Sequence, residues 1–149
     1  IAVLGYVLIS YTIGYKMNTI QAYPYELNTS NILGTLGFQL LLSGTSEEIL
    51  FRAFPIAVLG YVFRSYEHKN HTLEIIVSAL LFSIAHISWS ISPLEISFSW
   101  FQLIYAFILG LIYGISYVKS KSIIYPMIMH GLSNFFMIGI GYIFAGIIV

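Results

Sequence analysis

Long uninterrupted apolar runs, rather than alternating apolar and polar positions, dominate this chain. A membrane β-barrel strand needs a polar residue at every second position, and runs such as Ile75–Ile87 lack them. The pattern therefore predicts an all-α, multi-pass transmembrane helical bundle. The apolar stretches are Ile1–Tyr15, Asn31–Phe63, Thr72–Ser90, Ile96–Val118 and Ser122–Val149. The polar breaks between them are Lys16–Ser30, Arg64–His71, Ser92–Glu95 and Lys119–Lys121.

The second stretch is too long for one straight crossing. At about 1.5 Å per residue it would extend about 50 Å, against a hydrocarbon core of about 30 Å. We expect it to bend, divide or emerge from the bilayer, with the break at Ser43–Ser46, where a new helix can start because Thr45 and Glu48 have the spacing of a capping box. Pro55 could add a kink further along.

The last stretch is also long, and Gly139 and Gly141 could interrupt it. We expect about six helices, with five to seven allowed, in a single integral membrane domain over residues 1–149. The chain begins at Ile1 inside an apolar run and without an initiator Met, so we expect further sequence upstream. Ile1–Tyr15 lacks a basic region and a clear cleavage site, which argues against a signal peptide.

Composition strengthens the membrane interpretation. The chain is 58% hydrophobic and 8% charged, with a mean hydropathy of +0.88. A soluble domain carries about 25% charged residues. The net charge is zero and no basic run is present, which excludes a nucleic-acid partner. The absence of cysteine excludes disulfides, thiolate metal sites and cysteine nucleophiles. Nothing in the sequence specifies an oligomeric state.

Basic residues in the polar breaks predict the orientation in a cell membrane. Two breaks, 64–71 and 119–121, hold basic residues, whereas Ser92–Glu95 holds none. Because cytoplasmic loops are enriched in Lys and Arg, these two loops are expected to be cytoplasmic. The residues concerned are Arg64, Lys69, Lys119 and Lys121.

Several ionisable residues lie inside apolar stretches. Glu47, Glu48 and Arg52 fall within one, and His86 and His130 are embedded in two others. A charge at the bilayer centre costs about 2.5–3.5 kcal/mol even on lenient scales. Such residues are tolerated when they face one another or a water-filled cavity, so we predict that these side chains converge.

Three pairs with i, i+4 spacing support this convergence: Glu48 with Arg52, Phe82 with His86, and His130 with Asn134. Each pair alone has a structural interpretation. An intramembrane Glu–Arg pair can tie helices together, a single His can be a packing residue, and an Asn can hydrogen-bond between helices. Their joint occurrence favours a functional cluster.

The three pairs also fit three motifs in order. Glu47-Glu48-Ile-Leu-Phe-Arg52 matches EExxxR, Phe82-Ser-Ile-Ala-His86 matches FxxxH, and His130-Gly-Leu-Ser-Asn134 matches HxxxN. On separate hydrophobic segments, they resemble the motifs of the CPBP (Abi) family. That family includes the type II CAAX prenyl endopeptidases and bacterial proteins linked to bacteriocin processing or self-immunity. The resemblance covers about Leu40–Phe136, with Ala53 where many members have Gly.

The resemblance implies an intramembrane glutamate-type endopeptidase acting on a membrane-associated peptide or prenylated protein. Its working residues would be Glu47, Glu48, Arg52, His86, His130 and Asn134. On a helix, Glu48 is rotated about 40° from Arg52 and Glu47 about 140°, so Glu48 is the better ion-pair partner. Because two adjacent desolvated carboxylates disfavour double ionisation, Glu47 is left, with His86, to activate a water. His130 and Asn134 would stabilise the oxyanion.

Two alternatives remain from the sequence. No cofactor is expected, but Glu47, His86 and His130 could supply a zinc shell of two histidines and one carboxylate, although HExxH is absent. The chain could instead be a non-catalytic immunity or partner-binding protein, or a transporter that uses Glu and His as a proton relay.

Overall fold

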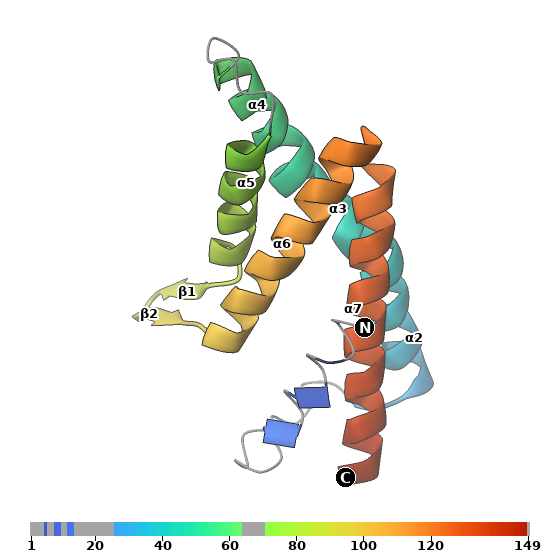
Figure 1. Ribbon diagram of the computed structural model, residues 1–149. Helices are drawn as coiled ribbons and strands as arrows, with labels where there is room; N and C mark the ends of the chain where they lie inside the picture. The colour runs from blue at the N-terminus through green and yellow to red at the C-terminus, as the bar shows by residue number, and fades with distance from the viewer. Residues whose placement is uncertain (1–4, 6–7, 10–11, 14–25, 64–70, 149) are drawn as a thin grey trace. The chain divides into compact units, whose positions relative to one another are not determined.

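The computed structural model describes residues 5, 8–9, 12–13, 26–63 and 71–148 (Figure 1). The predicted helix at Ile1–Tyr15 and the basic loop at 64–70 lie mostly outside these residues. The described residues form four helical segments and one β-hairpin, so the all-α class is confirmed, while the expected count of about six helices is not reached within them. The elements are α2 (Thr29–Phe38), η1 (Gln39–Ser43), α3 (Gly44–Glu48), η2 (Ile49–Ala53), α4 (Phe54–Val62), α5 (Thr72–Ile84), β1 (Ser88–Ile91), β2 (Leu94–Ser97), α6 (Trp100–Ser120) and α7 (Ile124–Ile148).

The chain divides into two compact units. One comprises residues 1–45 with 128–149, and the other comprises residues 46–127. The elements from α2 to α4 adjoin without a break in helical structure, and η1 and η2 are π-helical turns within that run. Asn28 caps its start, since the Asn28 side chain accepts a hydrogen bond from the Asn31 N–H at 2.9 Å.

The predicted division at Ser43–Ser46 is wrong. Gly44 keeps helical dihedral angles, with φ −59° and ψ −35°. The Thr45 hydroxyl does not cap a new helix, because it donates back to the carbonyl of Leu41 at 2.8 Å. A threonine inside a helix can satisfy its hydroxyl in this way, so capping-box spacing alone did not distinguish a helix start from a helix interior.

Pro55 acts through the backbone rather than by ending the helix. It lies in the first turn of α4, directly after η2. Since proline has no N–H, the carbonyl of Phe51 loses its α-helical donor. That carbonyl instead accepts hydrogen bonds from the Ser78 hydroxyl of α5 and from Arg52 Nη1, the latter at 3.3 Å. The proline thus creates an acceptor that ties α5 to this helix.

The α5–α6 pair forms the closest helix packing in the second unit. A Cβ added to Gly110 would lie 2.9 Å from the Cα and Cβ atoms of Ala79. One added to Gly114 would lie 2.9 Å from Cγ2 of Ile75. Small residues four apart let apolar helices approach closely, so this GxxxG spacing holds α6 against α5.

A β-hairpin stands where the two neighbouring helices were expected to extend. From the sequence we expected one helix to reach Ser90 and the next to start at Ile96. In the structure α5 ends earlier, at Ile84, and α6 begins later, at Trp100. Residues 88–91 and 94–97 pair as antiparallel strands. The reason is local: serine alternates with apolar residues in this segment, and a period of two favours a strand.

In the first unit, α7 packs against η1. The predicted interruption of the last stretch at Gly139 and Gly141 is wrong, because α7 is continuous. At Gly131 the two backbones meet, and an added Cβ would overlap the carbonyl oxygen of Leu40. Glycine at this position is therefore required for the close approach.

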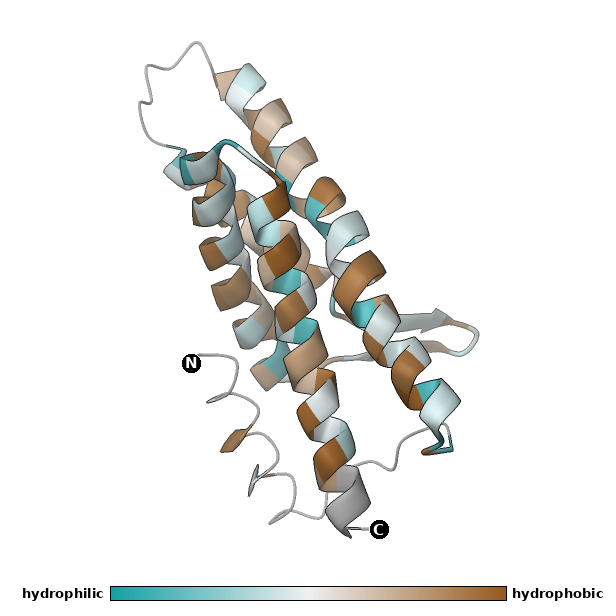
Figure 2. Ribbon diagram, turned by 90° about the vertical axis from the view of Figure 1, so that its right-hand side faces the viewer, coloured by the Kyte–Doolittle hydropathy of each residue, from teal (hydrophilic) through white to brown (hydrophobic). Residues whose placement is uncertain are grey.

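Among the residues that the structure describes, two helices are long and apolar enough to cross a membrane: α6, and Ile124–Phe144 of α7. Each holds 21 residues and extends about 31 Å, close to the thickness of a hydrocarbon core. Figure 2 shows apolar residues along the full length of these helices. Large apolar side chains such as Leu41 and Phe54 are exposed, whereas Glu48, Arg52 and Ser78 are completely buried. An apolar exterior around polar buried groups indicates a membrane protein.

Candidate active site

The first motif contains a completely buried ion pair. Arg52 Nε lies 3.3 Å from Glu48 Oε2, and neither side chain is exposed. The predicted pairing of Glu48 with Arg52 is confirmed. Arg52 lies in the π-helical turn η2, and such turns occur frequently at functional sites. Glu47 is half-buried, so the two adjacent carboxylates differ in environment.

Aromatic rings cover the arginine. The Arg52 Cζ atom lies 4.2 Å from the centroid of the Phe82 ring and 5.7 Å from that of Tyr113. Phe82 also meets Phe51 edge to face, with centroids 5.7 Å apart. A guanidinium over an aromatic face is stabilised by about 2 kcal/mol when desolvated. The contact joins the EExxxR segment to the FxxxH segment.

Phe82 also positions the histidine of its own motif. The rings of Phe82 and His86 pack edge to face with centroids 4.8 Å apart, which confirms the predicted pair. His86 Nδ1 lies 2.8 Å from the carbonyl oxygen of Phe82. Because a carbonyl only accepts, Nδ1 carries the proton, and Nε2 of the neutral ring is then an acceptor. His86 lies in the turn after α5, two residues before β1.

The third motif is held by residues that the sequence analysis did not single out. Asn134 Nδ2 donates to Gln39 Oε1 at 3.0 Å and to Ser43 Oγ at 3.2 Å. His130 is buried one turn earlier on α7. Gln39 and Ser43 are themselves four residues apart in an apolar run, and that spacing could have revealed them.

The six predicted residues fall into two sets. Glu47, Glu48, Arg52 and His86 belong to the unit of residues 46–127, whereas His130 and Asn134 belong to the other unit. Within the first set the structure links Glu48 to Arg52 directly and Arg52 to His86 through the ring of Phe82. The convergence of all six in one cavity stays a prediction.

Within each unit, the described residues include no group of three or more His, Cys, Asp or Glu that could hold a metal ion. The alternative zinc shell would take Glu47 and His86 from one unit and His130 from the other. Zinc binding therefore stays an untested alternative.

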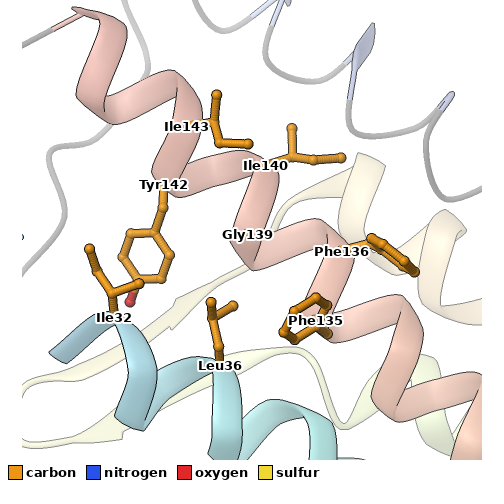
Figure 3. A pocket seen from close by; sticks show the side chains of 8 residues that line it. All are labelled: Ile32, Leu36, Phe135, Phe136, Gly139, Ile140, Tyr142 and Ile143. Carbon is orange, nitrogen blue, oxygen red and sulfur yellow. The ribbon is translucent and has the colours of Figure 1, made fainter. Parts of the chain in front are cut away.

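An apolar pocket of about 380 Å³ lies between α2 and α7 in the first unit. Ile32 and Leu36 of α2 face Phe135 and Tyr142 of α7 across it (Figure 3). Phe135 directly follows Asn134 in the chain. The remaining lining residues are Phe136, Gly139, Ile140 and Ile143.

Together these features define a helical membrane protein with a buried Glu48–Arg52 ion pair and, in the same unit, a half-buried His86. A family model described as type II CAAX prenyl endopeptidase Rce1-like matches residues 29–136. The match covers well over half of the chain, so the protein belongs to the Rce1-like type II CAAX prenyl endopeptidase family. The resemblance carried by the three motifs is thereby confirmed. No curated protein and no solved structure matches the chain.

Proposed function

We propose that this protein is an intramembrane endopeptidase that hydrolyses a peptide bond of a membrane-associated substrate. The observation that carries the proposal is the buried assembly in which the Glu48–Arg52 pair lies on Phe82 and Phe82 orients His86. An ion pair with no exposed surface carries a large desolvation penalty, so its presence in an apolar interior favours a functional role. Arg52 lies on the ring of Phe82, whose carbonyl accepts the hydrogen bond of His86 Nδ1, and a second carboxylate, Glu47, directly precedes Glu48 in the chain.

In the proposed mechanism Glu47 and His86 Nε2 hold a water molecule and one of them takes its proton. The water oxygen adds to the scissile carbonyl carbon and forms a tetrahedral intermediate. The intermediate collapses as the C–N bond breaks, and the abstracted proton passes to the leaving amine. Arg52 compensates the charge of Glu48, so that of the two carboxylates only Glu47 remains to act on the water.

We assign oxyanion stabilisation to His130 and Asn134. Both amide hydrogens of Asn134 already have acceptors, Gln39 and Ser43. The bond to Ser43 is the longer, and we propose that Asn134 exchanges it for the oxyanion. Gln39 then keeps the amide in place while the charge develops.

Family membership implies a protein or peptide substrate in the membrane, and we propose that a lipid-linked, CAAX-like chain end is the preferred one. The apolar pocket beside Asn134 supports this, because about 380 Å³ suits an extended hydrocarbon group. The matching family description concerns prenyl endopeptidases and gives no support to a role in bacteriocin immunity.

The proposal requires the two sets of motif residues to face each other. The chain contains no cysteine, so a pair introduced at Glu47 and Asn134 can be cross-linked without background. We expect a short bifunctional thiol reagent to join Glu47→Cys with Asn134→Cys. The matched control joins Glu47→Cys with Leu132→Cys, since Leu132 is exposed on α7. Equal yields from the two pairs would contradict convergence.

Sidedness is part of the proposal. Lys119 lies in the last turn of α6, and Lys121 caps the helix with a φ of 55° before α7 begins. The predicted break is thus a tight turn between two potential spans, and we propose that it faces the cytoplasm, as does the loop at 64–71. The test is labelling of Lys119 and Lys121 by a membrane-impermeant amine reagent. Labelling only from the side opposite the cytoplasm would contradict this orientation.

The activity itself is tested with purified protein in lipid vesicles and a quenched peptide carrying a prenylated CAAX end. We expect cleavage by the wild type and none by Glu47→Gln. A protein that binds the peptide equally with and without the substitution, and cleaves it in neither case, would be a partner-binding protein rather than a peptidase.

A further inference from the structure

The β-hairpin between α5 and α6 separates its side chains completely by polarity. The strand register pairs Trp89 with Ile96 and Ile91 with Leu94. Side chains of alternate pairs point to opposite faces, so these four lie on one face. The pairs between them place Ser88, Ser90, Glu95 and Ser97 on the other face.

The apolar face is uncovered in the described part of the chain. Its four side chains are between 66% and 78% exposed. Phe98 and Trp100 continue the exposed apolar surface toward α6, with ring centroids 5.1 Å apart. A two-stranded hairpin is marginally stable in water, and this one exposes its apolar side chains, so it needs an apolar environment.

The place of the hairpin in the fold identifies that environment. It joins the ends of α5 and α6 and projects sideways, across rather than along the two helices (Figures 1 and 2). Trp100 begins α6, whose 21 residues extend about 31 Å to the basic end at Lys119 and Lys121. If α6 spans the hydrocarbon core, the hairpin lies at the level where the core ends. Tryptophan prefers this level, because its ring is apolar while its N–H can reach water.

We propose that the apolar face of the hairpin lies in the boundary between the acyl chains and the headgroups, at the bilayer surface opposite Lys119 and Lys121. The serine and glutamate face is then turned to water. The hairpin is an in-plane anchor that fixes the depth of the end of α5. Since β1 starts two residues after His86, the anchor also fixes the height of that histidine.

The chain has only two tryptophans, which makes the depth measurable. In Trp100→Phe, Trp89 is the sole indole. The protein is placed in phosphatidylcholine vesicles in which the lipid carries bromine either near the headgroup or near the acyl-chain end. We expect blue-shifted emission from Trp89 and stronger quenching by the shallow bromine. Trp89→Phe, which retains Trp100 at the start of α6, should give a similar depth.

Two substitutions on opposite faces provide the matched control. Ile91→Glu adds a charge to the apolar face and should shift Trp89 emission to the red and reduce shallow quenching. Ser90→Glu adds the same charge to the polar face and should change neither. Three results for the Trp100→Phe variant would each overturn the proposal. Red emission without quenching would place Trp89 in water, and stronger quenching by the deep bromine would place it in the bilayer interior. Blue emission without quenching would mean that protein, such as a second copy of the chain, covers it. None of these readouts depends on peptide hydrolysis, so failure here is distinct from failure of the proposed activity.

Discussion

The guanidinium of Arg52 lies over the ring of Phe82, with 4.2 Å between Cζ and the ring centroid. The two residues belong to different motifs and are brought together by the packing of η2 against α5. The same ring contacts His86. A single phenylalanine therefore supports both the cation that compensates Glu48 and the histidine proposed to hold water.

Replacement of Phe82 should weaken both contacts. We expect Phe82→Leu to lower the free energy of unfolding in detergent by about 2 kcal/mol, the size of a desolvated cation–π contact, and to reduce hydrolysis. Phe54→Leu, at an exposed position of α4, is the control and should change neither quantity substantially. Equal losses in the two variants would mean that the ring contributes only apolar surface.

Substitutions at Glu47 and Glu48 should affect folding and activity differently. Glu48→Ala strands a buried arginine, and we expect it to cost about 3–5 kcal/mol and to lower the yield of folded protein. Glu47→Gln keeps the shape of the side chain and deletes the base, so it should fold normally and be inactive. Both are measured by size-exclusion yield, thermal unfolding and peptide cleavage. An unstable Glu47→Gln with an active Glu48→Gln would show that the roles are reversed.

Removal of both charges separates stability from function. The double variant Glu48→Leu with Arg52→Met replaces the ion pair by apolar side chains of similar size. Because no buried charge remains unpaired, we expect its folded yield to recover relative to Glu48→Ala. Hydrolysis should not recover. Activity in this folded double variant would exclude a role for the ion pair in the chemistry.

The carbonyl of Phe51 couples Pro55 to Ser78. Ser78→Ala removes a hydrogen bond and should cost about 1 kcal/mol of unfolding free energy. In a Pro55→Ala background the restored N–H can satisfy the same carbonyl, so the cost of Ser78→Ala should fall. A double-mutant cycle measures the difference. Identical costs in the two backgrounds would show that the proline does not create the acceptor.

Two glycines of α7 provide a paired test of the first unit. Gly131→Ala would press a methyl group against the carbonyl of Leu40, and we expect a loss of about 1–3 kcal/mol with disruption of the Asn134 hydrogen bonds. Gly139→Ala meets only Leu36 Cδ2 at 3.8 Å, an ordinary contact, and should be tolerated. Thermal unfolding of both variants measures the difference. An equally small loss of stability in the two would mean that α7 and η1 are further apart in solution.

Metal removal distinguishes the two enzyme mechanisms. If Glu47 and His86 activate water without a metal, strong chelators should leave hydrolysis unchanged. The measurement is activity after dialysis against chelator, together with metal analysis of the purified protein. Stoichiometric zinc whose removal abolishes activity and whose return restores it would replace this mechanism by a zinc site built on Glu47, His86 and His130.

The sequence by itself determined the class of the protein and the pairs within the first two motifs. Helical membrane character follows from apolar runs that no water-exposed fold can bury. The Glu48–Arg52 and Phe82–His86 contacts follow from i, i+4 spacing, which fixes neighbours along one helix wherever the helix packs. These are local properties, so they survived even where the predicted helix boundaries did not.

Tertiary structure decided what local spacing leaves open. The anchoring of Asn134 by Gln39 and Ser43 depends on partners more than ninety positions away in the chain. The contact of Arg52 with Phe82 is the clearest case, because thirty positions separate them and only the approach of α5 to η2 brings the cation to the ring. A residue pattern specifies which face of a helix is polar, whereas tertiary packing determines which neighbouring helix contacts that face.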